Sequence, residues 1–285
     1  MALPCSISRV LLSFPWDGIL TFVITGRLLD IVAQMTSVLS RPVTVKIRTG
    51  WDDKSPNAHK IIPMIQRAAS GKVAAVMVHG RSRLQRYHKA ANWDYILEAA
   101  QAQDAELPLV PVIGNGDILT VRDWDLRQRY IRGKMDDSER IGLCDCAMLA
   151  RGAIIKPWLP EEIKSGQEKD ISSSERFDIL KKFTNYGLDH WGSDQQGVNT
   201  TRRFLLEWLS FLHRYVPVGI LEQPQAMQQR PPKYRGRNDL ESLLSSPSAL
   251  DWIKISEMLL GPVPEEFQFE PKHKSNAYEG DVSNG

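Results

Sequence analysis

Four short, β-branched segments of the chain end in residues that could bind a ligand. Lys46 and Arg48 close the first segment, and His79-Gly80-Arg81 closes the second. Gly114-Asn115-Gly116-Asp117 follows the third, and Ala150-Arg151-Gly152-Ala153 follows the fourth. In parallel sheets and barrels, ligands gather at the carboxyl ends of the strands. We therefore expect these residues to contribute to one site.

The third and fourth strand ends have the composition of a phosphate site. A glycine beside a polar residue lets backbone N–H groups approach a phosphate closely, and Arg151 adds a charged donor. Taken singly, Lys46 is more typical of a solvated strand end, and His79 of a structural histidine. Together they could contact the polar edge of a ring system. Flavin mononucleotide (FMN) has a phosphate at one end and such a ring at the other, so it fits better than a simple sugar phosphate.

The elements that position these residues alternate between strand and helix. β-Branched runs alternating with amphipathic stretches indicate βα units and a parallel α/β sheet. Pro63 should kink the second helix or mark its start. The expected strands are 43–48, 74–79, 110–113 and 145–149, and the expected helices lie at about 26–39, 61–69 and 93–97 and from residue 120.

After residue 170 the pattern turns helical. Ser172-Ser173-Ser174-Glu175 offers a capping box, and Gly261-Pro262 should stop the last helix, which carries Leu250, Ile253 and Met258. Phe204, Trp208, Leu212 and Tyr215 recur at helical spacing and are more typical of a core than of a cofactor site. This part of the chain is predicted to be an all-α helical bundle.

Composition sets broad limits on the protein class. The 285 residues include 36 Lys or Arg and 34 Asp or Glu, a net +2 that neither demands nor excludes a polyanionic partner. Three cysteines give no disulfide framework and suggest a reducing compartment, the cytoplasm and/or the nucleus. Neither cysteines nor clustered histidines supply a four-ligand zinc site, so we expect no metal.

The first 25 residues form an atypical segment. Phe14-Pro15-Trp16-Asp17-Gly18 interrupts two apolar runs, which argues against a membrane span or a signal peptide. We see no strand pattern in this segment that would close a barrel. We therefore expect no membrane association.

The strand-end motifs resemble the tRNA-dihydrouridine synthase family in order and spacing. They are Thr44 to Gly50, His79 to Arg83 with Gln85-Arg86-Tyr87, Gly114 to Ile118, and Ala150 to Ala153. The resemblance implies an α/β fold, the C-terminal half of a (β/α)8 TIM barrel, strands five to eight, followed by the helical bundle. It implies flavin contacts from Lys46 and His79, and phosphate contacts from Asn115, Gly116, Asp117, Arg151 and Gly152.

Motifs in the helical part resemble the eukaryotic branch that acts on position 47 of tRNA. These are Asn185 to Leu188, His190 to Gly192, Thr201 to Tyr215 and Pro271 to Lys274. In that branch the helical domain helps to grip tRNA. Between residues 200 and 237 seven Lys or Arg accompany only two Glu, which indicates a phosphate-backbone patch or a solvated face. The candidate RNA contacts are Arg202, Arg203, Arg214, Lys233 and Arg235, with Arg81 and Arg83 near the flipped nucleotide or the flavin.

The family reaction implies a reductant and an acid. NADPH reduces the flavin, hydride passes to C6 of a uridine, and a cysteine protonates C5. That cysteine belongs to an Asn-x-Gly-Cys-Pro motif, which is not found before residue 27. Cys5 stands in another context, and Cys144 and Cys146 are interpreted as structural, so the proton donor is left unassigned. The zinc-finger extension usual in this branch is not found either.

These departures leave several interpretations open. Half a barrel has two open sheet edges, so we expect an N-terminally truncated product or a chain that needs a second chain. A non-catalytic RNA-binding remnant and another FMN-binding barrel oxidoreductase, such as a relative of dihydroorotate dehydrogenase, are the alternative functions. The expected parts are an atypical segment, 1–25, an FMN-binding partial barrel, 26–168, a tRNA-binding helical domain, 169–262, and a basic, polar tail, 263–285.

Overall fold

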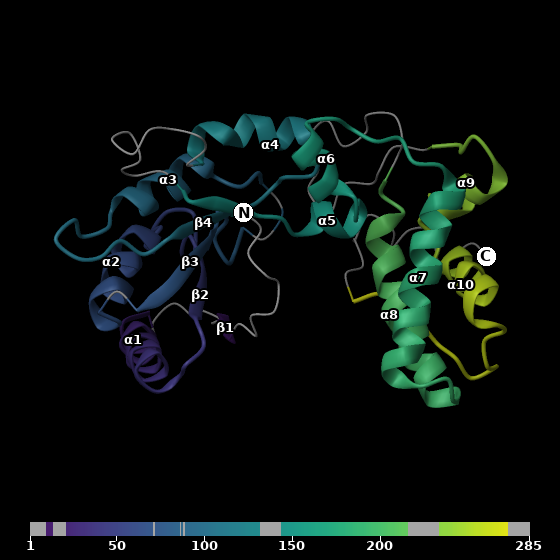
Figure 1. The fold of residues 1–285 in the computed structure, drawn as a ribbon, viewed down its shortest axis with the longest axis horizontal. Helices are drawn as coiled ribbons and strands as arrows, with labels where there is room; N and C mark the ends of the chain where they lie inside the picture. The colour runs from purple at the N-terminus through teal and green to yellow at the C-terminus, as the bar shows by residue number, and fades with distance from the viewer. Residues whose placement is uncertain are drawn as a thin grey trace. The chain divides into compact units, whose positions relative to one another are not determined.

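The computed structural model divides the chain into two compact units (Figure 1). The first unit comprises residues 1–118 and 123–150, and the second comprises residues 119–122 and 151–285. The expected domain boundary at residue 168 differs from this division, which assigns residues 151–168 to the second unit. The structure describes residues 10–13, 21–70, 72–85, 87, 89–131, 144–215 and 234–272, without the side chains of 10–13 and 21–25.

The first unit is built on a parallel sheet, as the alternating pattern predicts. Its five strands lie in the order β1-β2-β3-β4-β5, so each strand follows its sequence neighbour. One strand was not predicted, because the first lies in the segment where the sequence shows no strand pattern. The third expected strand is displaced by two residues toward the glycine-rich motif. The strands are β1 (Val10–Ser13), β2 (Val43–Arg48), β3 (Val73–His79), β4 (Val112–Asn115) and β5 (Cys146–Met148).

Helices α1 (Thr21–Val38), α2 (Ala58–Ala68) and α3 (Trp93–Gln101) contact strands β2, β3 and β4 respectively. Pro63 lies inside α2 and therefore does not mark its start. Along β2, Val43, Val45 and Ile47 are buried, whereas Lys46 and Arg48 are only half-buried. Successive side chains of a strand alternate between faces, so the two basic residues share the face opposite to that of the three aliphatic ones.

Two further elements lead to the last strand. These are α4 (Val121–Arg127) and a 3-10 turn (Gln128–Tyr130). Among the described strands, β1 and β5 each pair with one neighbour, so they form the two edges of the sheet. Cys146, in β5, is exposed.

The second unit is helical throughout the residues that are described. It contains α5 (Arg151–Ile155), α6 (Leu159–Ser165), α7 (Ser173–Trp191), α8 (Gln195–Leu212), α9 (Asp239–Leu244) and α10 (Ala249–Leu260). Leucines of α7, α8 and α9 pack with Trp252 and Ile255 of α10 in the main core. Ile155 and Trp158 pack with Tyr215 in a smaller cluster. This packing explains why α5 and α6 belong with the helical unit.

The expected capping box is present at the start of α7. Glu175 donates its backbone N–H to the Ser172 hydroxyl at 3.2 Å, and its carboxylate accepts the Ser172 N–H at 2.8 Å. The prediction for the aromatic stripe is confirmed only in part. Tyr215 is buried, but Phe204 is 52% exposed. Its ring stacks on that of Trp191, with centroids 4.7 Å apart.

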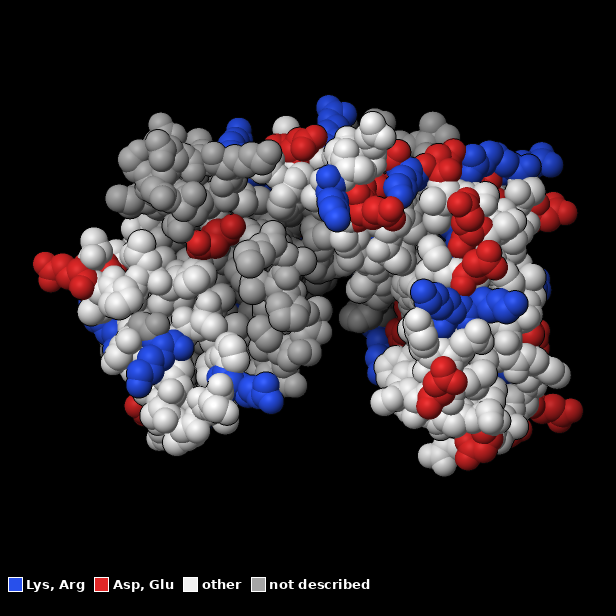
Figure 2. All heavy atoms as spheres, viewed as in Figure 1, with Lys and Arg blue, Asp and Glu red and all other residues white. Residues whose placement is uncertain are grey.

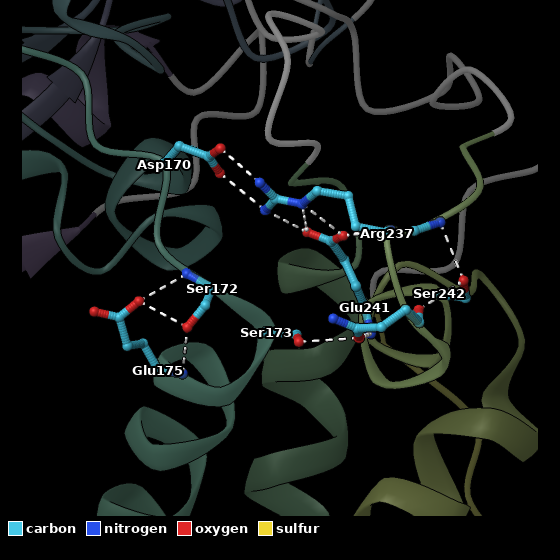
Figure 3. A network of polar contacts seen from close by, with 9 residues as sticks. Asp170, Ser172, Ser173, Glu175, Arg237, Glu241 and Ser242 are labelled. Atoms are coloured by element: carbon cyan, nitrogen blue, oxygen red, sulfur yellow. Dashed lines mark hydrogen bonds and ion pairs between the residues drawn. The ribbon is translucent and has the colours of Figure 1, made fainter.

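A polar network joins the connection before α7 to α9 (Figure 3). The Arg237 guanidinium donates to both oxygens of Asp170, at 2.7 and 3.0 Å, and to Glu241. Glu241 is buried, and hydrogen bonds from Arg237 are the main reason why its pKa is lowered. Ser173 completes the link by donating to Asn238, the N-cap of α9, at 3.0 Å. Arg237 therefore stabilises this unit by joining the segment before α7 to α9.

No helix in the described part of the chain is long and apolar enough to cross a membrane.

Candidate functional site

The predicted strand ends meet at one edge of the sheet. Arg48 is in register with His79, His79 with Asn115, and Asn115 with Met148. Partners in a parallel ladder place their side chains on the same face. The sequence prediction that residues of β2, β3 and β4 converge is therefore confirmed within the first unit.

Lys46 is held by a side chain two strands away. Its ammonium donates to the amide oxygen of Asn115 at 2.9 Å, and the Asn115 NH2 donates to the carbonyl of Met148 at 2.9 Å. Burial, and then the charge of Arg48, lowers the pKa of Lys46 from 10.5 to about 8. At neutral pH this lysine is a partly desolvated cation. Asn115 was expected to contact a phosphate, but its side chain orients Lys46 instead.

Arg81 lies in the interior and not on a surface that faces solvent. Its side chain is 2% exposed and forms an ion pair with Asp117, Nη2 to Oδ2, at 2.7 Å. Its Nε donates to the Lys89 carbonyl at 2.7 Å. These contacts correct the interpretation of Arg81 as an RNA contact. The carboxylate of Asp117 is likewise committed to Arg81 and would repel a phosphate, so the expected contact there is restricted to the backbone.

The loop after β4 approaches its neighbours closely. Gly116 has φ of 142°, and a Cβ at this position would lie 2.4 Å from the Cβ of Ala91. A Cβ on Gly114 would lie 2.5 Å from the ring of Trp93, whose Nε1 donates to the Gly116 carbonyl at 2.9 Å. Asp117 also has a positive φ, 52°. Only glycine suits the first two positions, so the backbone of this loop is fixed.

Arg151 and Gly152 begin α5 and belong to the second unit. Gly152 is buried and Arg151 is half-buried. The phosphate site expected from both strand ends therefore remains a prediction.

The expected basic patch of the helical unit is divided between surface and interior. Arg202 is fully buried, donates to the Ser256 hydroxyl at 2.8 Å and to the Gly261 carbonyl at 2.9 Å, and is thus a brace of α8 against α10. Arg214 is buried as well, which argues against a surface contact. Arg203 and Arg235 are exposed, and Lys233 lies outside the described residues. On the face shown in Figure 2, basic and acidic side chains are interspersed.

Exposed aromatic groups in the helical unit were not predicted. Tyr186 and Trp191 of α7 and Phe204 of α8 are exposed, and the Lys182 ammonium lies 5.8 Å from the Tyr186 ring centroid. Helical spacing had suggested that Phe204 is a core residue. The two preceding residues differ in burial: Arg202 is buried, whereas Arg203 is exposed like Phe204. In the first unit, Arg83 is half-buried beside the ring of Trp51.

Of the two described cysteines, Cys144 is buried and Cys146 is exposed. Burial, and then Asp145 and Cys146, raises the pKa of the Cys144 thiol to about 12. A thiol this weakly acidic fits the structural interpretation of Cys144. Cys5 lies outside the described residues. Within those residues, no cluster of three His, Cys, Asp or Glu could hold a metal ion.

Comparison with known proteins identifies the family. The model of the dihydrouridine synthase (Dus) family matches residues 26–213, which include every strand-end motif of the first unit. The chain belongs to the dihydrouridine synthase family. The alternative of a dihydroorotate dehydrogenase relative is therefore set aside.

Curated members of the family are similar along most of the chain. A Xenopus tropicalis protein named tRNA-dihydrouridine(47) synthase NAD(P)(+)-like is 54% identical over 256 residues, which is 89% of this chain and 37% of that protein. The Homo sapiens protein of the same name is 54% identical over 251 residues, 87% of this chain and 36% of that protein. A Cryptococcus neoformans tRNA-dihydrouridine(47) synthase is 51% identical over 267 residues. The chain thus spans little more than a third of the length of these relatives.

Proposed function

We propose that the protein takes part in the flavin-dependent reduction of uridine to 5,6-dihydrouridine at position 47 of tRNA, with NADPH as the reductant. This chain contributes the flavin-binding sheet and a helical RNA-binding unit. The observation that carries the proposal is the Lys46–Asn115 pair, which lies beside His79 at the carboxyl edge of the sheet. Family membership and the names of the relatives supply the reaction class.

The residues of the first unit fit FMN. Lys46 presents a half-buried, partly desolvated cation of the kind that pairs with the polar, electron-rich edge of a reduced isoalloxazine ring. His79 lies in the next strand, and Gly116 packs so closely against Ala91 that a side chain there would clash with the protein itself. FMN bound here would supply hydride-transfer chemistry, with NADPH as the source of the two electrons. Residues of the first unit would hold and orient FMN, with the Gly116 backbone proposed at its phosphate. The phosphate contacts expected of Arg151 and Gly152, which belong to the second unit, stay a prediction.

We also propose that β2 to β5 correspond to strands five to eight of a (β/α)8 barrel. Among the described strands, β1 and β5 each pair with a single neighbour and so form the edges of the sheet. A further segment or a second chain that pairs with these edges would complete the barrel. Localisation to the cytoplasm and/or the nucleus remains part of the proposal.

The helical unit offers groups that suit single-stranded or splayed RNA. Arg203 and Phe204 are adjacent and exposed on α8, and Phe204 stacks on Trp191 of α7. Exposed aromatic rings stack on bases, and nearby cations neutralise phosphates. A target base must leave its stack to reach a buried flavin, which requires a grip on the flanking RNA. We propose Arg203, Arg235 and the Trp191–Phe204 pair as this grip, and Arg83 of the first unit as a contact of the flipped nucleotide or the flavin.

The same observations support a second function, an RNA-binding remnant without catalysis. The proposed RNA groups of α7 and α8 belong to the second unit and the Lys46 site to the first, so binding of RNA and of flavin can be tested separately. One assay separates the two functions. The chain is incubated with FMN, NADPH and unmodified tRNA, and dihydrouridine at position 47 is measured by mass spectrometry. Dihydrouridine supports the synthase, whereas binding of FMN and tRNA without product supports the remnant. Binding of neither contradicts both.

A further inference from the structure

We infer that Arg81 is a positioning residue that fixes the His79 ring as a neutral imidazole with its proton on Nδ1. The inference rests on the proposed function only in that His79 is thereby held ready for a flavin. Arg81 had been a candidate for RNA or flavin contact, and its geometry assigns it a different task.

The Arg81 guanidinium is fastened on three sides. Nη2 pairs with Asp117, Nε donates to the Lys89 carbonyl, and Nη1 lies 3.4 Å from His79 Nε2. The side chain also lies beside the ring of Tyr87, with 5.5 Å between Cζ and the ring centroid. These contacts leave the Arg81 guanidinium little freedom to turn toward solvent.

Asp117 is fixed as firmly as its partner. Its Oδ2 accepts from Arg81 and from the backbone N–H of Ala91 at 2.6 Å. Both side chains of the pair are at most 2% exposed. Asp117 follows β4, whereas Lys89 and Ala91 belong to the loop between β3 and α3. The pair therefore joins the ends of two neighbouring strands.

The state of His79 follows from the chemistry of arginine. A guanidinium has only donors and stays protonated. His79 Nε2, facing Nη1, must therefore accept, and the ring proton resides on Nδ1. A histidine placed at a surface would be free to exchange between tautomers, but His79 is buried against this fixed donor.

A lysine could not replace Arg81. Its ammonium is a point charge that could reach Asp117 but not also Lys89 and His79, since these partners lie around a planar fork. The Arg81→Lys variant therefore keeps the ion pair and loses the donor to His79. The variant therefore distinguishes a role of Arg81 in positioning His79 from a role of its positive charge alone.

The test is NMR of the imidazole nitrogens in the full chain without flavin, with His79 assigned by the loss of its signals in His79→Gln. We expect Nε2 of the wild type to resonate as an unprotonated nitrogen, and to shift toward the protonated range in Arg81→Lys. A protonated Nε2 in the wild type, or an unchanged spectrum in the variant, overturns the inference.

Binding measurements add a second readout. Arg81→Lys should weaken FMN binding by about tenfold, the equivalent of one strong hydrogen bond, and leave tRNA affinity unchanged. The exposed Arg67–Asp104 pair of the same unit, 3.1 Å apart, supplies the control, and Arg67→Lys should change neither the spectrum nor FMN binding. A loss of tRNA affinity with unchanged FMN binding would show that Arg81 contacts RNA. If the wild type binds no FMN, the proposed function fails, while the nitrogen spectrum still decides the role of Arg81.

Discussion

Lys46 illustrates the conflict between stability and binding at the scale of a residue. Its charge is partly desolvated, and Arg48 adds repulsion, so its pKa falls to about 8. The folded protein therefore carries a cost that an apolar side chain would not impose. The flavin contact that we propose for Lys46 would explain why a charged side chain is kept at this position.

We predict that Lys46→Met stabilises the chain at pH 7. Removing the buried charge should raise the free energy of unfolding by about 1–3 kcal/mol, in line with the lowered pKa and reduced by the lost bond to Asn115. The folded pKa lies below that of the unfolded chain, so wild-type stability rises with pH between about 8 and 10.5. The advantage of Lys46→Met should therefore be full below pH 8 and shrink above it.

Urea unfolding at several pH values measures this difference. Lys60, exposed on α2, is the matched control, and Lys60→Met should leave stability nearly unchanged. A Lys46→Met variant less stable than the wild type at pH 7 would contradict the account.

The sequence predicts some site residues and not their partners. Lys46, His79 and Asn115 could be identified because each follows a β-branched run, and parallel strands share a carboxyl edge. The ion pair of Arg81 and Asp117 could not be predicted, because these residues lie 36 positions apart in the sequence. They meet only because the strands that precede them are neighbours in the sheet. Arg202 and Arg203 have the same side-chain chemistry and lie on one helix. Only the structure shows that Arg202 is buried and that Arg203 is exposed.

Among the secondary-structure elements, those set by residues close together in the sequence could be predicted, whereas those that depend on tertiary packing could not. The capping box of α7 follows from Ser172 and Glu175 alone. Helices α5, α6 and α9 were missed because they have 5, 7 and 6 residues, too few to show a helical period. Strand β1 was missed because it has only 4 residues and lies in an apolar run without alternation.

Ser172→Ala should destabilise the helical unit by about 1 kcal/mol, because the N–H of Glu175 loses its acceptor. Thermal unfolding followed by circular dichroism measures the change. Ser174→Ala, an exposed position within the first turn that no cap depends on, is the control. Equal losses in the two variants would mean that the capping box is not what stabilises the start of α7.

His213 should make the helical unit sensitive to acid. Burial, and then Arg214, lowers the pKa of its ring to about 4, and Nδ1 donates to the Leu209 carbonyl at 3.1 Å. Between pH 6.5 and 4 the unfolded chain takes up a proton that the folded one does not, so stability falls as pH falls. We expect a loss of about 2–3 kcal/mol over this range.

His213→Asn keeps a donor near Nδ1 and removes the titration, so its stability should depend less on pH in this range. The exposed His190 provides the comparison, and His190→Asn should retain the full dependence. Urea unfolding at pH 4, 5 and 6.5 measures all three proteins. An identical pH dependence in wild type and His213→Asn would contradict this role.

For the whole molecule, the order of α/β and helical parts could be predicted, because hydrophobic periodicity changes near residue 170. The boundary at Arg151 could not, since α5 and α6 follow the last strand in sequence but pack with Tyr215. Charge counts alone do not separate the roles of the basic residues between 200 and 237, which include the buried Arg202 and also Arg237, an exposed residue that pairs with Asp170 and Glu241.

We propose that this chain binds FMN through the carboxyl edge of its sheet. The most direct test is titration of the purified chain with FMN, followed by quenching of flavin fluorescence, for the wild type, Lys46→Met and Lys60→Met. We expect saturable binding of one FMN per chain in the wild type and in Lys60→Met, and loss of this binding in Lys46→Met. No saturable binding by the wild type, or equal affinity in Lys46→Met, would contradict it.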